Sequence, residues 1–524
     1  MPNDDAMLDW IPQSVPWKNW HETVKAPIIG THMVWYPADE PQYGSSAINR
    51  CTAQIQRAIA DARAKGRSCR VVGRGWSLSD IAVTNGALID LSRLKGMKPL
   101  AAQQLDPAYP GTPDDAAGLW LIQCGAYISE INRMIESDRF GRSMRTTGAA
   151  NGQTIVGAAA TGTHGSVLGR NALHDQIVAV HLLAGDKKQY WLERASYPVL
   201  KPSLAASLGA EVKRDDKLFN AVVLGLGAFG VIHNVVLETR PRALFKAISF
   251  DKDAAGKPLV LDEAMRKVIA TLDFASHPML KPAAGLGKPY FFQPIIDPNS
   301  NPVQVLATMM FEQPWQQGYQ PDYRMAEAKF GPGYDFLSTL GRLLDVFKPG
   351  VPLVAQVAKA ELFDTRPRTA SWGELFGFKT PRTLVASGSV AVPLERALET
   401  LDILIALNKT VGPAPLVFGC RYVAKSKALL AMNRFDTTFV VSIDGVYNKT
   451  SLAFFAAVPK AMEAAGIPFG QHWGKANDYT PARVRAAFGS NLDDWIAARH
   501  ELLPDPADRA MFTNDYMRKR GLDA

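Results

Sequence analysis

The fold of this chain is decided by the stretch Arg70-Val71-Val72-Gly73-Arg74-Gly75-Trp76-Ser77-Leu78-Ser79. Its β-branched beginning predicts a buried strand, and two glycines follow at once. Glycines let successive backbone N–H groups converge on an anion, and Arg74 with the two serines adds further donors. The stretch lacks the GK[ST] ending of a nucleoside-triphosphate loop. It predicts a loop that holds a diphosphate, with a plain β-turn as the alternative.

The elements around this loop predict a mixed α and β region. Apolar residues between Ser46 and Gly66 fall at helical spacing, and Gly66 ends the pattern. A second, short helix is marked by Ile128, Ile131, Met134 and Ile135. Further strands are expected at Cys69–Val72, Ala87–Leu91 and Leu119–Cys124, with a hairpin at Ile177–Leu183 and Gln189–Leu192.

A second loop rich in small residues runs from Gly152 to Ser166. Glycine at such density costs conformational entropy and weakens strands, so it marks a place where a ligand approaches the backbone. Tight chain crossing is the alternative, with His164 as a core histidine. Two such loops in one region indicate a large cofactor that carries a diphosphate.

The segment Gly225–Gly230 has the GxGxxG pattern of dinucleotide-binding proteins. That fingerprint has to open a helix, so that the pyrophosphate lies at the helix N-terminus. Here the next residues, Val231–Leu237, are β-branched and favour a strand. We therefore interpret Ala221–Leu237 as two buried strands joined by a tight turn, too short and too interrupted for a membrane span.

The residue pattern of the chain changes near Arg240-Pro241-Arg242, where proline-rich stretches begin to alternate with amphipathic ones. A proline-rich stretch at Lys281–Pro302 predicts a loop, and the apolar repeat in Pro393–Leu407 predicts an amphipathic helix. A second domain is expected to begin here.

Composition narrows the classes of function. Of the 524 residues 47% are hydrophobic and 21% charged, which is typical of a globular protein. The excess of basic over acidic residues, 58 against 50, forms no long stripe, so nucleic acid is not an expected partner. The four cysteines have no CxxC spacing, and no metal site is expected. The acidic start MPNDDAMLDW is no secretory signal, and we expect a cytoplasmic protein without a transmembrane segment.

The motifs together resemble the vanillyl-alcohol oxidase / p-cresol methylhydroxylase (PCMH) flavoproteins. The order matches that family: Arg70–Ser79, Thr154–Ser166, Leu226–Ile232 and Gln471-His472-Trp473-Gly474-Lys475. The HWGK motif at 472–475 and the closing stretch Asp505–Tyr516 resemble the branch of sugar-1,4-lactone and alditol oxidases. Matches extend from about Ile48 to Tyr516.

The resemblance implies an α+β, two-domain FAD-binding PCMH-type fold. It places an FAD-binding domain at 1–241, a cap of antiparallel sheet flanked by helices at 242–465, and a C-terminal segment at 466–524 that returns to the FAD domain. The GxGxxG segment then is a turn between strands of the FAD domain. The residues expected to bind FAD are Gly73, Arg74, Gly75, Trp76, Ser77, Ser79, Thr154, Gly157, Ala158, Thr161, Gly162, His164, Gly165, Gly230, Ile232 and Lys475.

Trp76 departs from the family pattern. Many relatives have a histidine there that bonds covalently to the flavin, and indole nitrogen cannot take that role. No cysteine lies within Thr154–Ser166 for a second attachment. The FAD is therefore expected to be non-covalent, and the electron acceptor, oxygen or another, stays open.

The cap strand also departs from the family pattern. The branch carries Glu-x-Arg facing the flavin, and the counterpart here is Gly419-Cys420-Arg421. Loss of the carboxylate leaves space for a bulkier or less polar substrate. Ser442 and Asp444 fall where relatives place substrate-facing polar groups, and Asp444 would restore a carboxylate. Asp444-Gly445 is also a common turn dipeptide, which is the alternative for that residue.

In flavin-dependent alcohol oxidation a hydride passes from a substrate C–H to flavin N5, and negative charge develops near the pyrimidine edge of the ring. A fixed cation there is worth several kcal/mol in comparable preorganised sites. By motif position Lys475 is the expected cation, with Arg421 second. His472 is expected to orient the substrate or accept the hydroxyl proton, or else only to pack and to bond the backbone.

Three functions follow. The main hypothesis is an FAD-dependent oxidase or dehydrogenase of a CH–OH group on a sugar lactone or polyol. The second keeps this chemistry on a bulkier hydrophobic alcohol such as a sterol, because of Gly419 and a long cap. The third is a flavin-free binding protein on the same fold.

Overall fold

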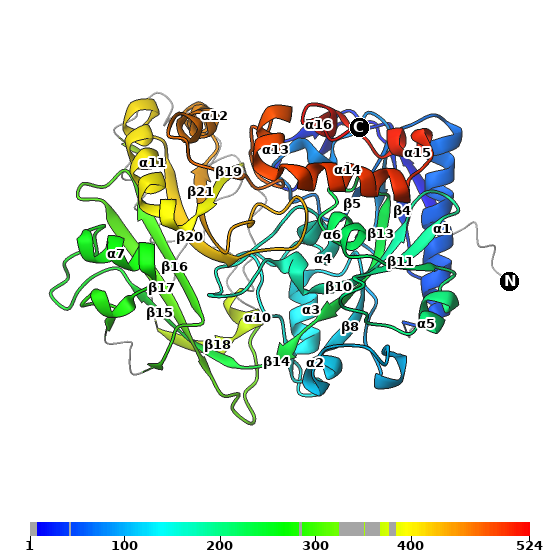
Figure 1. The fold of residues 1–524 in the computed structure, drawn as a ribbon, viewed down its shortest axis with the longest axis horizontal. Helices are drawn as coiled ribbons and strands as arrows, with labels where there is room; N and C mark the ends of the chain where they lie inside the picture. The colour runs from blue at the N-terminus through cyan, green and yellow to red at the C-terminus, as the bar shows by residue number, and fades with distance from the viewer. Residues whose placement is uncertain (1–7, 41–42, 282–285, 324–349, 352–366, 377–383) are drawn as a thin grey trace.

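The computed structural model describes residues 8–40, 43–281, 286–323, 350–351, 367–376 and 384–524. They form two lobes that lie side by side in Figure 1. What we call the first lobe contains the elements from β1 to β13 and the C-terminal helices. The second lobe contains a seven-stranded sheet and the helices packed on it. The family-based expectation of a mixed α+β fold is confirmed.

A four-stranded sheet in the first lobe carries the glycine loop. Its order is β1 (Leu8–Pro12), β4 (Gly30–Val34), β6 (Ala87–Asp90), β5 (Cys69–Val72), and the last three strands are parallel. Helix α1 (Ser45–Ala64) matches the predicted helix, and its apolar face at Cys51, Ile55 and Ile59 is fully buried. The loop Gly73–Ser79 therefore leaves the carboxyl end of an edge strand beside a parallel neighbour.

A six-stranded sheet completes the first lobe. Its order is β12 (Glu211–Arg214), β11 (Gln189–Glu193), β10 (Ile177–Leu183), β13 (Val231–Glu238), β8 (Leu119–Gln123), β7 (Met97–Pro99). The predicted hairpin is present as β10 and β11. Smaller elements are β2 (Trp17–Lys18), β3 (Lys25–Ala26), α2 (Pro113–Ala117), α3 (Ile128–Ile135), β9 (Arg142–Ser143), α4 (Ile155–Ala160), α5 (Pro202–Ser207), α6 (Asp216–Val222) and β14 (Arg240–Pro241).

The prediction of two strands across Ala221–Leu237 is wrong in its first half. Residues up to Val222 belong to helix α6, and only β13 is a strand. The apolar run misled because a fully buried helix and a buried strand look alike over a few residues. The GxGxxG segment thus joins a helix to a strand and opens no helix, which agrees with the rejection of a dinucleotide fingerprint.

The sheet of the second lobe is antiparallel throughout. Its order is β18 (Arg368–Ser371), β15 (Leu244–Phe250), β17 (Gln304–Gln313), β16 (Phe291–Asp297), β20 (Leu416–Ala424), β21 (Thr437–Val446), β19 (Val385–Pro393). Helices α7 (Glu263–Thr271), α11 (Ala397–Val411) and α12 (Lys449–Ala464) cover one face (Figure 1). The loop predicted at Lys281–Pro302 is wrong in part, because β16 lies inside it and includes the buried Pro294.

The C-terminal helices lie on the first lobe, although the strands that precede them in the chain belong to the second lobe (Figure 1). They are α13 (Pro481–Phe488), α14 (Ser490–Leu502), α15 (Pro506–Met511) and α16 (Asp515–Arg518). Trp495 packs edge-on against Phe229, and the buried Arg499 donates to the carbonyl oxygen of Ala228 at 3.1 Å. These contacts hold the turn that follows α6.

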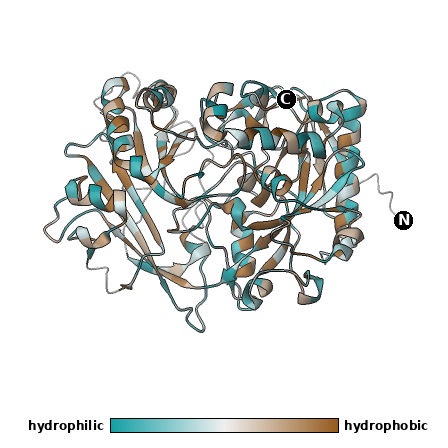
Figure 2. Cartoon of the chain, viewed as in Figure 1, coloured by the Kyte–Doolittle hydropathy of each residue, from teal (hydrophilic) through white to brown (hydrophobic). Residues whose placement is uncertain are grey.

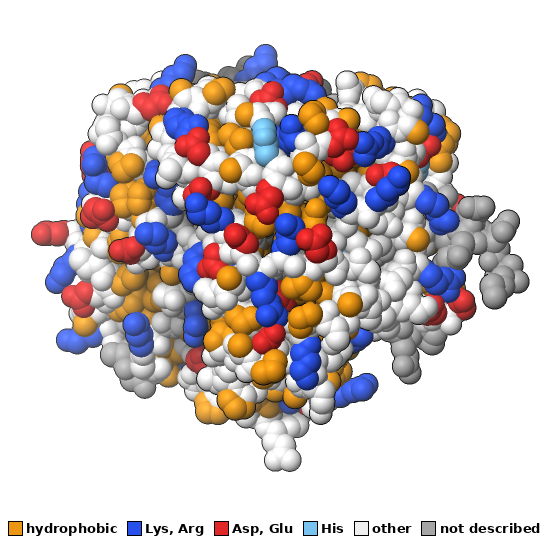
Figure 3. All heavy atoms as spheres, turned by 45° about the vertical axis from the view of Figure 1, so that its right-hand side comes forward, with side chains coloured by type: hydrophobic (Ala, Val, Ile, Leu, Met, Phe, Trp, Pro, Cys, Tyr) orange, Lys and Arg blue, Asp and Glu red, His pale blue; other side chains and the backbone are white. Residues whose placement is uncertain are grey.

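Hydrophobic residues follow the strands and the inward sides of the helices in Figure 2. On the face shown in Figure 3, basic and acidic side chains are interspersed. Within the described ranges, no helix combines the length and apolar character needed to cross a membrane.

Candidate active site

A cavity of about 710 Å³ lies between the two lobes. One wall comes from the first lobe, through the Gly73–Leu78 loop, helix α4 and the turn at Gly225–Gly230. The other comes from the inner face of the second lobe's sheet, through β16, β20 and β21. Ligand sites of enzymes are commonly concave sites of this size at domain interfaces.

The predicted glycine loop is tied to the HWGK motif. The Leu78 N–H donates to the carbonyl oxygen of Gly474 at 2.7 Å, and Ser79 Oγ donates to that of Trp473 at 2.7 Å. Gly75 has φ +61°, a backbone conformation that favours glycine. Two motifs that stand 400 residues apart in the chain therefore form one wall of the cavity.

Arg74 is already engaged by aromatic rings. Its guanidinium lies 4.6 Å from the ring centre of Trp20 and 5.1 Å from that of Tyr127. Ser77 offers its carbonyl oxygen to the Asn19 amide at 2.9 Å. These contacts of Arg74 and Ser77 help to fix the shape of the loop.

The segment Thr154–Ser166 was expected to be a loop, and this is wrong in part. Its first half is helix α4, with Thr154 as the residue before the helix. A Cβ on Gly73 would lie 2.4 Å from Thr154 Oγ1, so the glycine permits close approach of the two predicted segments. The predicted residues of this segment that line the cavity are Thr154, Gly157, Ala158, Thr161 and His164. Gly162 (φ +84°) and Gly165 shape the chain behind them.

The turn at Gly225–Gly230 also reaches the cavity, and Gly230 and Ile232 line it as predicted. Arg70, which sequence reasoning did not single out, fixes this turn. Its guanidinium donates to the carbonyl oxygens of Leu226 and Gly227. Burial lowers the pKa of Arg70 to about 10, so it remains charged at neutral pH.

Buried polar atoms around the cavity fit a large polar cofactor. Trp76 Nε1 and Gln153 Oε1, which line it, have no hydrogen-bond partner among the described residues. The same holds, in the chain just before α4, for the side chains of Thr146, Thr147 and Asn151. Buried polar groups are nearly always satisfied, so this grouping indicates that a ligand completes the site. Sequence reasoning missed Thr146–Asn151, although Gly148-Ala149-Ala150 has the same small-residue signal.

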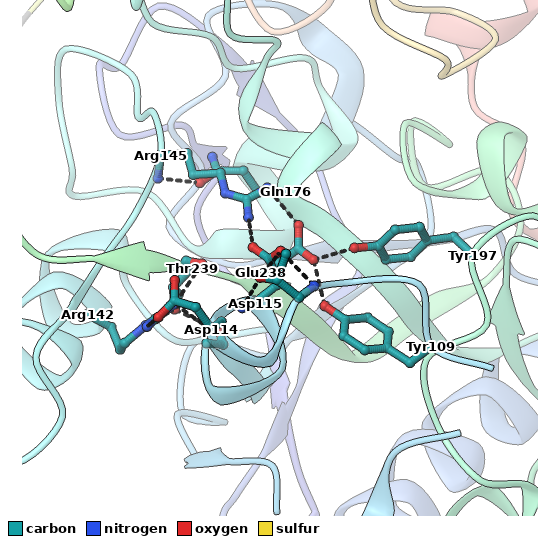
Figure 4. Close-up of polar contacts among 11 residues, drawn as sticks. Tyr109, Asp114, Asp115, Arg142, Arg145, Gln176, Tyr197, Glu238 and Thr239 are labelled. Atoms are coloured by element: carbon teal, nitrogen blue, oxygen red, sulfur yellow. Dashed lines mark hydrogen bonds and ion pairs between the residues drawn. The ribbon is translucent and has the colours of Figure 1, made fainter. Parts of the chain in front are cut away.

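A network of hydrogen bonds and ion pairs anchors the chain just before Thr146 (Figure 4). Glu238, at the end of β13, accepts from Arg145 Nη1 at 2.7 Å, Tyr109 OH at 2.9 Å and Tyr197 OH at 2.5 Å. The Arg145 N–H donates to Gln176 Oε1 at 2.8 Å. Because Arg145 directly precedes Thr146, the network fixes the position at which the stretch with the unpartnered polar side chains begins.

Trp76 lies among aromatic rings. It stacks on Trp20 with ring centres 5.6 Å apart, and the His21 ring meets it edge-on at 5.6 Å. A Cβ on Gly152 would lie 2.4 Å from Trp76 Cζ2, so the indole is clamped between two chain segments. His21 lines the cavity as well and is a residue that sequence reasoning missed.

Residues predicted to be catalytic meet where the HWGK motif contacts strand β21, next to its partner β20. Lys475 Nζ donates to Asp444 Oδ1 at 3.1 Å and to Ser442 Oγ at 3.3 Å. Arg421 Nη1 donates to the carbonyl oxygen of His164 at 3.2 Å, and its Nε has no partner among the described residues. Burial lowers the pKa of Lys475, which Asp444 opposes, and burial also lowers the pKa of Arg421. Asp444 lies inside β21, so its interpretation as a turn residue is wrong.

Two histidines line the cavity in opposite tautomers. His164 Nδ1 faces the carbonyl oxygen of Gly165 at 3.1 Å, so Nδ1 carries the proton and Nε2 has the lone pair. His472 Nδ1 accepts the Gly474 N–H at 3.0 Å, so in the neutral ring Nε2 carries the proton. Burial, with the nearby cations, lowers the pKa of His472 to about 3 and that of His164 well below its usual value. Both rings are neutral at pH 7.

The remaining wall is mainly apolar. Gly419 pairs with Ser442, and a Cβ there would have ordinary contacts, the nearest with Gln293 Nε2 at 3.6 Å. Beyond it lie apolar side chains from four elements or their ends: Ala247, Phe291, Ile295, Met310, Leu375 and Phe376. Polar side chains of the same sheet also line the cavity, namely Ser249, Gln293, Thr308 and Arg368. Sequence reasoning missed them because side chains from separate strands meet only in the sheet.

Known sequences match this chain. A family model described as FAD binding domain matches residues 47–193. L-gulono-1,4-lactone dehydrogenase of Mycobacterium tuberculosis is 26% identical over 483 residues, covering 90% of this chain and 95% of that protein. D-arabinono-1,4-lactone oxidase of Debaryomyces hansenii is 26% identical, over 38% of this chain and 33% of that protein. L-gulonolactone oxidase of Mus musculus is 25% identical, over 38% and 37%.

Solved structures share the fold. A solvent-stable cholesterol oxidase has a TM-score of 0.69 at 14% identity, covering 99% of both chains. A cholesterol oxidase variant from Brevibacterium sterolicum has a TM-score of 0.70 at 13% identity, covering 99% of this chain and 98% of that one. At such identities the likeness shows the fold alone.

The fold, the cavity and these relatives define an FAD-dependent oxidoreductase. These matches support the expected resemblance to the vanillyl-alcohol oxidase / p-cresol methylhydroxylase flavoproteins, in the branch of the sugar-lactone oxidases and dehydrogenases. The expected enzyme class and the FAD cofactor are confirmed.

Proposed function

We propose that this enzyme oxidises a CH–OH group of a sugar lactone or polyol. The observation that carries the proposal is the meeting of Lys475 and Arg421 with two neutral histidines, His164 and His472, at one cavity between the lobes. FAD, when bound, supplies the acceptor for the hydride of the substrate C–H bond. We propose that the cofactor is non-covalent, because Trp76 has no nucleophilic nitrogen.

In this proposal Lys475 is the fixed cation of the site. Asp444 and Ser442 hold its ammonium group in place before the reaction, so no reorganisation is needed when negative charge develops. Arg421 is the second cation, and its unpartnered Nε leaves a donor for a ligand. Both cations need to remain charged, and Asp444 supports this by raising the pKa of each.

The two histidines take different roles. His472 cannot accept a proton at Nε2 in its present tautomer, so it donates a hydrogen bond to the substrate oxygen. His164 presents a lone pair at Nε2 and accepts the hydroxyl proton. This assignment replaces the expectation that His472 is the base.

A second substrate class is favoured by one part of the cavity. The apolar wall beyond Gly419 fits an alcohol with a bulky hydrophobic body, such as a sterol. The lactone relatives support the polar substrate, whereas this wall supports the apolar one. The FAD-binding match argues against the flavin-free alternative.

The proposal also includes the domain division and the location. We propose that 1–241 and 466–524 bind FAD and that 242–465 form the cap, which agrees with the placement of the C-terminal helices on the first lobe. A cytoplasmic location is proposed from the four cysteines, all of them free and buried.

The test is a panel of alcohols offered to the purified holoenzyme with oxygen and with an artificial acceptor. Bleaching of the flavin absorption near ~450 nm by one class of alcohol identifies the substrate. Turnover with oxygen distinguishes an oxidase from a dehydrogenase. Failure of all polyols, lactones and apolar alcohols to reduce the flavin would refute the proposal.

A further inference from the structure

A buried carboxylate joins the two lobes outside the site described so far. Glu136 follows the end of α3 in the first lobe and is 0% exposed. It accepts hydrogen bonds from Ser371 Oγ at 2.7 Å, the Gly373 N–H at 2.8 Å, Tyr323 OH at 2.9 Å and Ser143 Oγ at 3.4 Å. Three of these four donors belong to the chain of the second lobe.

The donors lie on the element that forms part of the cavity wall. Ser371 ends β18 and precedes helix α10 (Trp372–Leu375), which packs against α3 (Figure 1). Leu375 and Phe376, at the end of α10, line the cavity. A Cβ on Gly373 would lie 2.8 Å from Glu136 Oε2, so the glycine lets the backbone approach the carboxylate.

Acidic and basic groups surround this contact on every side. Glu374 of α10, itself buried, accepts from the Ser371 N–H and from Tyr319 OH. Arg242 donates to the carbonyl oxygen of Glu136 and also pairs with Asp138. Arg133 lies over the ring of Tyr323. No cation in the described chain pairs directly with the Glu136 carboxylate.

We infer that Glu136 is a positioning residue that fixes α10 on the first lobe and thereby sets the Leu375–Phe376 wall of the substrate cavity. Its effect on substrate choice rests on the proposed function, whereas its effect on α10 does not. Four donors converge on this one carboxyl group, and three of them come from the other lobe.

The contact has a predictable pH dependence. Burial raises the pKa of Glu136 from its ordinary value of 4.5 to about 7. A carboxyl group whose pKa is raised in the assembled state takes up a proton when the contact forms. The stabilisation is therefore greatest below pH 4.5, declines as the pH rises toward about 7 and changes little above it.

Hydrogen–deuterium exchange of the holoenzyme tests the inference on the peptide 368–376 between pH 5 and pH 8. The exchange rate of this peptide is divided by that of an exposed peptide at the same pH. This removes the intrinsic pH dependence of amide exchange and leaves the protection of α10. In the wild type, protection of α10 should fall at least threefold from pH 5 to pH 7. In Glu136→Gln it should not depend on pH. Tyr323→Phe, which deletes one donor, should lower protection at every pH even if Glu136→Gln does not fold.

The matched control is Glu193→Gln. Glu193 is equally buried, but its partners all lie in the first lobe: the Trp191 indole, the N–H groups of Val199 and Leu200, and the Arg214 guanidinium. It should keep the wild-type pH dependence of α10. In turnover, Glu136→Gln should raise KM for long apolar alcohols at least threefold with kcat nearly unchanged.

A wild-type pH dependence of α10 protection in Glu136→Gln, or wild-type protection of α10 at every pH in Tyr323→Phe, would overturn the inference. If no alcohol reduces the flavin of the wild type, the proposed function fails, and the exchange results alone decide the role of Glu136.

Discussion

Lys475 Nζ lies 3.1 Å from Asp444 Oδ1, across the boundary between the HWGK motif and strand β21. This ion pair orients the only lysine in the described chain that lines the cavity. The lysine stands on a motif shared with the family, whereas the carboxylate comes from a strand with no motif. Their pairing directs the ammonium group into the space between the lobes.

Changing Lys475 to Met should slow flavin reduction at least tenfold, because the site loses its fixed cation. Tenfold corresponds to about 1.4 kcal/mol of transition-state stabilisation. Stopped-flow absorption under anaerobic conditions measures it, and the spectrum before mixing checks that FAD stays bound. Lys460→Met, on the exposed side of α12, is the control. Unchanged reduction would exclude this role for Lys475.

Changing Asp444 to Asn should move the alkaline limb of the pH–rate profile to lower pH. Burial lowers the pKa of Lys475, and Asp444 raises it. Activity requires the charged lysine, so it is lost as the pH rises through this pKa, and removing Asp444 brings that loss to lower pH. The profile of kcat/KM measures the shift. Asp478→Asn, which disrupts a surface pair with Arg483, should leave the limb in place.

The two histidines can be separated by matched asparagine variants. In His164→Asn the amide can still donate to the Gly165 carbonyl oxygen, but the acceptor corresponding to Nε2 is lost. In His472→Asn the amide oxygen can still accept the Gly474 N–H. Single-turnover reduction should slow at least a hundredfold in the first variant and less than tenfold in the second, within the range of general-base effects. The reverse order would return the role of base to His472.

Gly419→Glu should shift preference toward polar substrates. A Cβ there meets only ordinary contacts, so the side chain fits and places a carboxylate beside Arg421 in the cavity. The ratio of kcat/KM for a polyol to that for a bulky apolar alcohol should rise at least tenfold. Gly419→Ala is the control, because it fills part of the space at this position without adding a carboxylate. Equal ratios in all three proteins would show that Gly419 does not govern substrate choice.

Acid precipitation should release all the yellow colour into the supernatant, since Trp76 cannot bond to the flavin. The absorption spectra of pellet and supernatant measure this. His21→Ala serves as a second sample, because His21 lies against Trp76 at the cavity. Colour that stays on the wild-type pellet would refute non-covalent binding, and its loss in His21→Ala would identify the attachment.

Helices and strands could be predicted where the spacing of apolar residues along the local sequence distinguishes the two. The periodic apolar face of α1 and the hairpin of β10 and β11, whose strands are joined through Gly185-Asp186, appear where they were expected. The run Ala221–Leu237 was not, because burial on all sides removes the periodicity that separates helix from strand. The helix inside Thr154–Ser166 was missed because its alanines and glycine resemble a loop composition.

The sequence by itself indicated the cofactor, the family resemblance and the candidate for the main cation, because these depend on short segments whose spacing the chemistry constrains: the glycine loop, the small-residue segment and the HWGK motif. Only the tertiary structure decided that Asp444 holds Lys475, that His164 and His472 carry their protons on opposite nitrogens, and that the cavity wall beyond Gly419 is mainly apolar. Each of these is a relation between strands or loops far apart in the chain. Such pairings are fixed by sheet register and by the packing of one lobe on the other, which no local pattern encodes.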